Sequence, residues 1–174
     1  MNDGAMRTTF EEVLGKYALR DGLVMDTRVN GGGDLVADLA MCLSGNRFFD
    51  YTVDDRSAGF EPNFRRTKPS VSLANEANYS DGHCYAYAYK DQKIGLVGMP
   101  TPGTCTFAGW ESVQGGIRWG VPGLGVKDAN TGRYLENLQT DPDVLAMNEY
   151  DKVSKGQDQR LAAAIEALMR LVRR

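Results

Sequence analysis

The sequence has few of the side chains that bind transition metals, because its 174 residues include one histidine and three cysteines. The cysteines, Cys42, Cys84 and Cys105, are odd in number, and their spacing does not fit a zinc site. We therefore expect neither a metal site nor a structural disulfide. Nothing in the sequence calls for an organic cofactor either, so no cofactor is predicted.

An excess of basic residues and a long apolar run are also missing. The formal net charge is −3, whereas binding to phosphate groups requires a basic face, so nucleic acid is not expected as the main partner. No apolar stretch approaches the roughly 20 residues that a membrane span needs. The first residues lack the basic and apolar zones of a signal peptide.

What is present is a pattern of apolar residues that predicts strands alternating with helices, and hence an α/β fold. The predicted strands span residues 22–28, 70–75 and 93–100. The predicted helices span residues 8–19, 34–45, 80–90 and 158–174. Because helices connect the strands, the strands are expected to be parallel. The length of the chain suits a single domain, residues 1–174.

Local signals predict caps, loops and turns. Thr8 or Thr9 is expected to cap the first helix. Residues 46–69 are polar, aromatic and of mixed charge, which predicts a long irregular excursion. Residues 104–138 contain glycine, tryptophan and β-favouring residues, which predicts short antiparallel strands. Turns are expected there at residues 120–123 and 128–132.

Two polar turns, each between a predicted strand and a predicted helix, are candidate sites for chemistry. Residues 30–33, Asn-Gly-Gly-Gly, can point backbone N–H groups at a negative oxygen, or they can simply form a tight turn. Ser80 opens the second turn, where a nucleophilic serine would have the positive end of a helix dipole beside it. Serine is also a common helix cap, so the local pattern leaves both roles of Ser80 open.

Two titratable side chains are candidates for supporting roles. A serine nucleophile needs a base, but His83 lies three residues after Ser80 on the same helix and would reach back only with difficulty. We expect His83 to be a surface or capping side chain instead. Glu136 is flanked by apolar residues. Its carboxylate can be partly buried and used in a site, or it can be an exposed acid at the end of a strand.

Four segments in one order resemble the tail-specific, or C-terminal-processing, serine peptidases, and the tricorn-like branch in particular. The segments are GLVMDTRVNGGGDLVADLA, NEANYSDGHCYAYAY, IGLVGMPTPGT and RYLENLQTDPDV, ahead of the C-terminal helix. The resemblance covers about residues 1–172. It implies a ClpP/crotonase-like spiral of strands and helices with a small antiparallel β region.

The resemblance also implies roles for individual residues. Ser80 would be the nucleophile, and the backbone N–H groups of Asp81 and Gly33 would form the oxyanion hole. Glu136 would be the glutamate that completes the charge relay. The other main branch of the family places a lysine base after a GxxTxG motif. In this sequence Thr104 stands near that position and no lysine is present there, so a Ser/Lys pair is not expected.

The tricorn-like branch uses a histidine base from an earlier part of the polypeptide. We therefore expect residues 1–174 to be the C-terminal catalytic subdomain of a larger serine endopeptidase, inactive alone, with the base supplied by an upstream part of the same polypeptide. Its substrate would be a peptide or an unfolded protein, and the resemblance suggests a homo-oligomer. Members of the family occur in the cytoplasm and in the cell envelope, so the compartment is not predicted.

Two other functions fit the same residues. A non-catalytic peptide-binding or interaction module would need no base. A crotonase-like acyl-CoA enzyme would also place two N–H groups around an acyl oxygen, but the sequence shows no basic cluster for the phosphates of coenzyme A.

Overall fold

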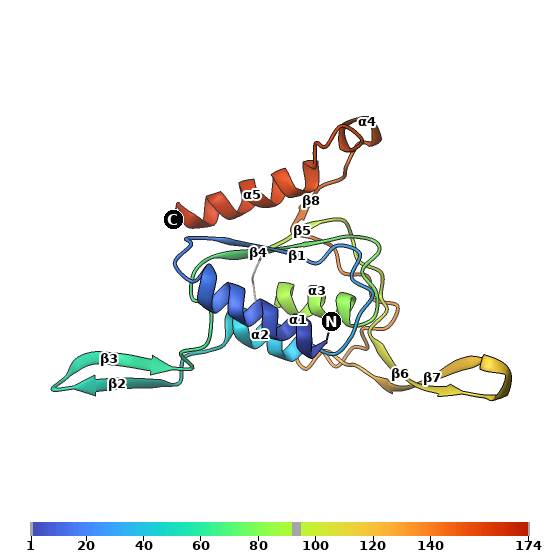
Figure 1. Ribbon diagram of the computed structural model, residues 1–174, viewed down its shortest axis with the longest axis horizontal. Helices are drawn as coiled ribbons and strands as arrows, with labels where there is room; N and C mark the ends of the chain where they lie inside the picture. The colour runs from blue at the N-terminus through green and yellow to red at the C-terminus, as the bar shows by residue number, and fades with distance from the viewer. Residues whose placement is uncertain (1, 92–94, 174) are drawn as a thin grey trace.

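A computed structural model describes residues 2–91 and 95–173. Figure 1 shows three layers, in which a sheet lies between helices on both of its faces. The sheet has four parallel strands in the order β1-β4-β5-β8. These strands are β1 (Leu23–Asp26), β4 (Ser70–Ala74), β5 (Gly95–Gly98) and β8 (Val144–Leu145). The predicted α/β class is confirmed, although the first two residues of the predicted strand 93–100 lie outside the described residues.

Helices cover both faces of the sheet (Figure 1). One face carries α1 (Asp3–Phe10), its π-helical continuation (Glu11–Lys16), α2 (Val36–Ser44) and α3 (Asp81–Asp91). The opposite face carries α5 (Gln159–Val172), which follows the short helix α4 (Tyr150–Val153). Helices α2, α3 and α5 lie where the sequence predicts them.

Strand β4 is buried along its whole length, which explains why the sheet needs helices on both sides. Val71 and Leu73 pack against Leu168 of α5. The alternate residues face the other layer, where the hydroxyl of Tyr89 donates a hydrogen bond to Oγ of Ser70 at 2.9 Å. Because successive side chains of a strand point to opposite faces, the side chains of β4 pack into the cores on both sides of the sheet.

The first helix begins before the threonines that were expected to cap it. Helix α1 starts at Asp3, and Oδ1 of Asn2 accepts the N–H of Ala5 at 2.9 Å. Thr8 and Thr9 lie inside the helix, where their hydroxyls donate to carbonyls four residues earlier. The predicted cap is wrong because Asn2 supplies a cap acceptor about two turns upstream.

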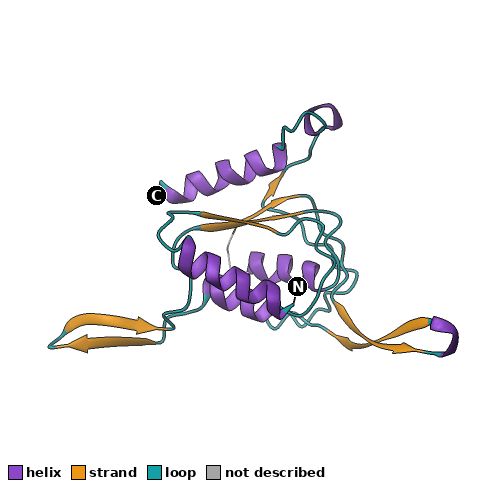
Figure 2. Ribbon diagram, in the orientation of Figure 1, coloured by secondary structure: helices purple, strands orange, loops and turns teal. Residues whose placement is uncertain are grey.

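Two hairpins project from the body in opposite directions (Figure 2). The first joins β2 (Phe49–Val53) to β3 (Arg56–Glu61), so the prediction that residues 46–69 are irregular is wrong for residues 49–61. Asp54 and Asp55 connect these strands with φ angles of 50° and 62°, as a two-residue type I′ turn requires. The prediction failed because every residue of β2 is exposed, so the strand has no apolar alternation.

The second hairpin joins β6 (Thr106–Ser112) to β7 (Arg118–Gly125), which are antiparallel as predicted. Its turn lies between these strands and includes the 3₁₀ turn Gln114–Gly116. Residues 120–123, where a turn was expected, lie within β7.

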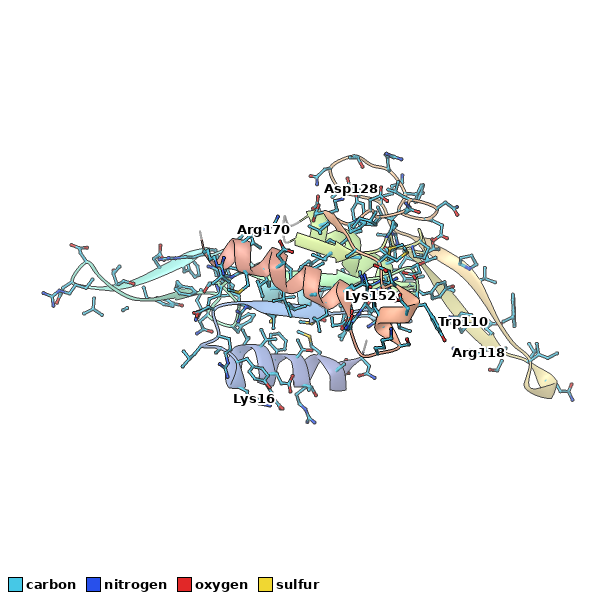
Figure 3. The ribbon with its side chains drawn as sticks, turned by 90° about the horizontal axis from the view of Figure 1, so that it is seen from above. Lys16, Trp110, Arg118, Asp128, Lys152 and Arg170 are labelled. Atoms are coloured by element: carbon cyan, nitrogen blue, oxygen red, sulfur yellow. A yellow bond between two sulfur atoms is a disulfide. The ribbon has the colours of Figure 1, made fainter. Side chains whose placement is uncertain are left out.

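Side-chain contacts support this arm and the segment that follows it. The guanidinium of Arg118 lies over the ring of Trp110 at 4.7 Å (Figure 3). The predicted turn at 128–132 is present, since Oδ1 of Asp128 accepts the N–H groups of Asn130 and Thr131.

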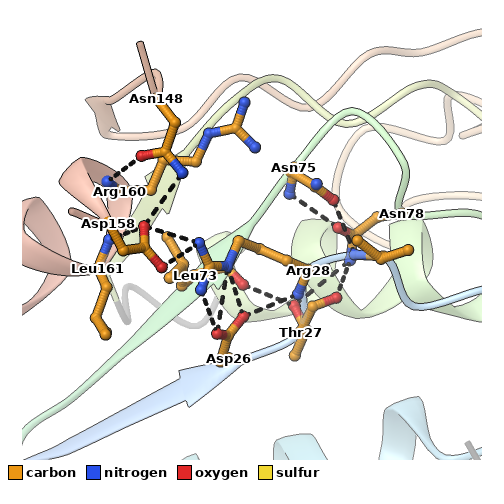
Figure 4. Close-up of polar contacts among 11 residues, drawn as sticks. Asp26, Thr27, Arg28, Leu73, Asn75, Asn78, Asn148, Asp158, Arg160 and Leu161 are labelled. Carbon is orange, nitrogen blue, oxygen red and sulfur yellow. Dashed lines mark hydrogen bonds and ion pairs between the residues drawn. The ribbon is translucent and has the colours of Figure 1, made fainter. Parts of the chain in front are cut away.

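An ion pair of Arg28 connects the start of the C-terminal helix α5 to the end of β1 (Figure 4). Nη1 of Arg28 lies 2.7 Å from Oδ2 of Asp158, the residue that caps α5 by accepting the N–H of Leu161. Asp26 binds the same guanidinium through Nε and Nη2, and this hydrogen bonding raises the pKa of Arg28. Segments from opposite ends of the chain therefore share one ion-pair network.

Cys84 of α3 and Cys105, which precedes β6, form a disulfide, so the expectation of no disulfide is wrong. Their Cα atoms are 5.3 Å apart although 21 residues separate them in sequence. The prediction failed because it rested on the odd number of cysteines. Two of the three form the disulfide, and the third, Cys42, is a buried free thiol. Burial raises the pKa of Cys42 to about 11.

The described residues offer neither a membrane span nor a metal cluster. No helix within 2–91 or 95–173 combines the length and the apolar character that crossing a bilayer demands. Within the same ranges, no group of three His, Cys, Asp or Glu side chains is placed to hold a metal ion.

Candidate functional site

Ser80 lies at the turn into α3 and has an unusual backbone conformation. Its φ is 53°, in the left-handed region that few residues other than glycine adopt. Its carbonyl accepts the N–H groups of His83 at 2.9 Å and Cys84 at 3.1 Å, so α3 begins immediately after it. A serine that only caps a helix has an extended backbone, whereas a strained turn between strand and helix is typical of a nucleophilic serine.

The glycine loop lies directly against this turn. Gly32 has a φ of 104°, and a Cβ on it would lie 2.8 Å from Cβ of Ser80 and 3.1 Å from the nitrogen of Asp81. The two segments are also hydrogen-bonded, because the carbonyl of Asn30 accepts the N–H of Tyr79 at 2.9 Å. The structure therefore brings together the two turns that the sequence singled out.

Asp81 is buried and connects the starts of two helices. Its Oδ2 accepts the N–H of Leu35, directly before α2, at 2.9 Å. Burial raises the pKa of the Asp81 carboxyl, although the hydrogen bond from Leu35 opposes this effect. The side chain is thus a structural link, while the backbone nitrogen of the same residue lies beside Gly32.

Gly33 is exposed and has a φ of 148°. It borders a surface hollow whose other residues are Asn2, Asp3, Gly4 and Asp34. The close contact with Ser80 is made by its neighbour, Gly32. The contribution of the Gly33 N–H to an oxyanion hole stays a prediction.

Thr104 contacts Ser80 from another side, although the sequence pattern assigns it no role. Its Oγ1 accepts the backbone N–H of Ser80 at 3.0 Å, across 24 residues of sequence. The backbone N–H of Thr104 in turn donates to Nδ1 of His83 at 3.2 Å. The one signal that could have identified Thr104 was its place after the GMPTPG stretch, residues 98–103.

His83 is completely buried, which corrects the expectation of a surface or capping side chain. Its Nε2 lies 3.0 Å from Oγ1 of Thr140. Since Nδ1 accepts a hydrogen bond from Thr104, the neutral ring carries its proton on Nε2 and donates it to Thr140. Burial lowers the pKa of His83, while a hydrogen bond to the Leu138 backbone and the charge of Glu136 act in the opposite sense. Both ring nitrogens are therefore engaged away from the Ser80 hydroxyl.

Glu136 is exposed and lies in a turn that docks beside Thr104. The next residue, Asn137, has a φ of 60°, and its N–H donates to the carbonyl of Gly103 at 2.8 Å. The turn that contains Glu136 is thus joined to Gly103, the residue before Thr104. Its function in a charge relay stays a prediction.

Comparison with known proteins connects this geometry to a family. Residues 2–146 match the family described as peptidase family S41. A tricorn protease homolog from Saccharolobus solfataricus is 28% identical over 158 residues, which make up 87% of this chain and 14% of that protein. A tricorn protease from Thermoplasma volcanium is 28% identical over 156 residues, covering 87% of this chain and 15% of its own length. The chain therefore spans about a seventh of the length of these two relatives.

Solved structures share the fold. The crystal structure of the tricorn protease superposes with a TM-score of 0.75 at 20% identity, covering 99% of this chain and 19% of its own. The photosystem II D1 C-terminal processing protease gives a TM-score of 0.60 at 19% identity, covering 96% of this chain and 44% of its own. The spiral α/β architecture implied by the sequence is thus found in solved proteins.

Proposed function

The chain belongs to peptidase family S41, a family of serine peptidases, and on this premise we propose that Ser80 is the nucleophile of an endopeptidase. The observation that carries the proposal is the conformation of Ser80, whose φ of 53° places it in a strained turn at the start of α3. The backbone of Gly32 against Ser80 supports it further, because this packing keeps the turn in one conformation.

In the proposed reaction, Oγ of Ser80 attacks the carbonyl carbon of a peptide bond as a base removes its proton. The carbonyl oxygen becomes an oxyanion, which the backbone N–H groups of Asp81 and Gly33 stabilise together with the positive end of the α3 dipole. The amine then leaves with the proton from the base, and water hydrolyses the acyl-enzyme in the second half of the reaction. Substrates are peptides or unfolded proteins.

The base is a histidine outside residues 1–174, supplied by an upstream part of the same polypeptide, with Glu136 assisting its orientation. The chain has one histidine, and the hydrogen bonds of His83 to Thr104 and Thr140 occupy both of its ring nitrogens. Residues 1–174 alone should therefore hydrolyse peptides many thousand-fold more slowly than the full-length polypeptide.

The test is made on the full-length polypeptide with a denatured protein and short peptides as substrates. Ser80→Ala should lower kcat/KM by on the order of 10³ or more, and it should abolish labelling by a fluorophosphonate. Ser154→Ala, at an exposed serine after α4, is the matched control and should leave both unchanged.

Other outcomes of the same test identify the alternatives. A full-length polypeptide that binds denatured protein without cleaving it, and that is not labelled at Ser80, would favour an interaction module. A rise in melting temperature with an acyl-CoA would favour the crotonase-like function.

A further inference from the structure

Residues 101–105, which we call the Thr104 segment, pass beside Ser80 and are bonded to other parts of the structure at both ends. At its first residue, Thr101 exchanges two backbone hydrogen bonds with Thr140, at 2.9 and 3.0 Å. At its last residue, Cys105 is joined to Cys84 of α3 by the disulfide. Between these ends, the carbonyl of Gly103 accepts the N–H of Asn137 at 2.8 Å. The position of Thr104 is thus fixed from both sides.

Thr104 connects this segment to Ser80 and to the buried imidazole. Its Oγ1 accepts the Ser80 N–H, and its own N–H donates to Nδ1 of His83. The same imidazole bonds Thr140 through Nε2. A continuous chain of hydrogen bonds therefore runs from Thr140 through His83 and Thr104 to the backbone of Ser80.

These hydrogen bonds act on the backbone φ angle of Ser80, which is 53°. A left-handed conformation at a residue other than glycine costs on the order of 1–3 kcal/mol and persists only where the surroundings impose it. Rotation of the Ser80 backbone toward an ordinary helical or extended conformation would turn its N–H away from Thr104. The hydrogen bond to Thr104 Oγ1 thus opposes relaxation of the turn.

We propose that Thr104 is a positioning residue that holds Ser80 in its left-handed conformation, and that His83 orients Thr104 through the Nδ1 hydrogen bond. The inference rests on the proposed function, in which Ser80 is the nucleophile. In this role Thr104 acts through its contact with Ser80 and not on the substrate. It sets the direction of the serine hydroxyl, so its loss affects the chemical step and not the affinity for substrate.

The first test compares Thr104→Val, which keeps the shape of the side chain but removes the acceptor oxygen, with Thr104→Ser, which keeps the oxygen. In the full-length polypeptide, Thr104→Val should lower kcat about tenfold or more with KM within about twofold, whereas Thr104→Ser should retain most of the wild-type kcat. Thr67→Val, at an exposed threonine, is the control. Equal kcat values for Thr104→Val and wild type would overturn the inference, as would equal losses in the valine and serine variants.

The second test does not depend on catalysis. Hydrogen exchange of the Ser80 amide should be slow in the wild-type and Thr104→Ser polypeptides and at least about tenfold faster in Thr104→Val. If Thr104→Val does not fold, as judged by its melting transition, Thr104→Ala takes its place in both tests. If Ser80→Ala retains activity, the proposed function fails, yet the exchange rates still decide whether Thr104 holds the Ser80 backbone. Unchanged exchange in the variant without the hydroxyl would refute the positioning role on its own.

Discussion

The backbone of Gly32 lies against the side chain of Ser80, so that a Cβ added to Gly32 would meet Cβ of Ser80 at 2.8 Å. This contact joins the loop after β1 to the turn after β4, although the two segments are far apart in sequence. The two parallel strands are neighbours in the sheet, so their carboxyl ends lie side by side, where α/β folds commonly build their sites.

Gly32→Ala should therefore damage both the fold and the site. The new Cβ meets Ser80 and the carbonyl of Tyr79 within 3.0 Å, and the φ of 104° is unfavourable for alanine. We expect the free energy of unfolding to fall by about 1–3 kcal/mol, together with most of the peptidase activity of the full-length polypeptide. Gly31→Ala is the matched control, because a Cβ at Gly31 meets nothing within 4 Å. Equal melting temperatures and activities in the two variants would contradict the prediction.

Reduction of the Cys84–Cys105 disulfide should destabilise the chain. Opening a loop of this length lowers the free energy of unfolding by about 3 kcal/mol in the chain-entropy estimate, and it releases the end of the Thr104 segment. Thermal unfolding with and without a phosphine reductant measures the effect. The double variant Cys84→Ser/Cys105→Ser should melt at a lower temperature than wild type and show no response to reductant. Cys42→Ala should keep the response, since Cys42 is not in the disulfide.

Asp81→Asn should stabilise the chain at pH 7. Burial raises the pKa of Asp81 from 3.8, so the native state binds more protons than the unfolded state in the window above that value. Stability is lost as the pH rises through this window and is not regained at neutral pH. Asparagine keeps an oxygen for the N–H of Leu35 without the buried charge, so the melting temperature should rise.

Asp81→Ala is the matching comparison for that substitution. It leaves the N–H of Leu35 without its side-chain acceptor, which costs about 1–3 kcal/mol. A melting temperature for Asp81→Asn at or below that of Asp81→Ala would show that the carboxylate charge itself is needed.

His83 should make the chain less stable in mild acid. Burial lowers the pKa of His83, with a hydrogen bond to the Leu138 backbone and the Glu136 carboxylate opposing this effect, whereas an unfolded histidine titrates at about 6.5. Between the lowered pKa and about 6.5 the unfolded state binds more protons, so the free energy of unfolding falls as the pH falls through this window. Urea unfolding at pH 7.5 and pH 5.5 measures the slope. His83→Gln should flatten it, and an equal slope in the variant would assign the effect to other groups.

The sequence predicts the layers of this fold better than it predicts their contacts. Residues 70–75 combine apolar side chains (Val71, Leu73, Ala74) with small serines, which suits the strand β4, because β4 is buried on both faces. Residues 49–53 carry no such pattern because their strand is exposed, so the hairpin was missed. Local periodicity reports burial and not the presence of a strand.

The site was predicted in part for a related reason. Ser80 and the glycine loop carry local signals, namely a polar turn and consecutive glycines between a strand and a helix. Thr104 bonds Ser80 across 24 residues of sequence and His83 across 21, and no local pattern encodes such a pairing. The other ring nitrogen of His83 bonds Thr140, which is 57 residues away.

The two hairpin arms should be less stable locally than the three-layered body of the molecule. In the part of the chain that the structure describes, each arm is a two-stranded sheet of its own, and such ribbons are marginally stable without further packing. Their amides should exchange first, and limited proteolysis should cut at the two tips before it reaches the sheet. A chain nicked at both tips would still hold its three layers together, so the conformation of Ser80 should outlast the loss of both arms.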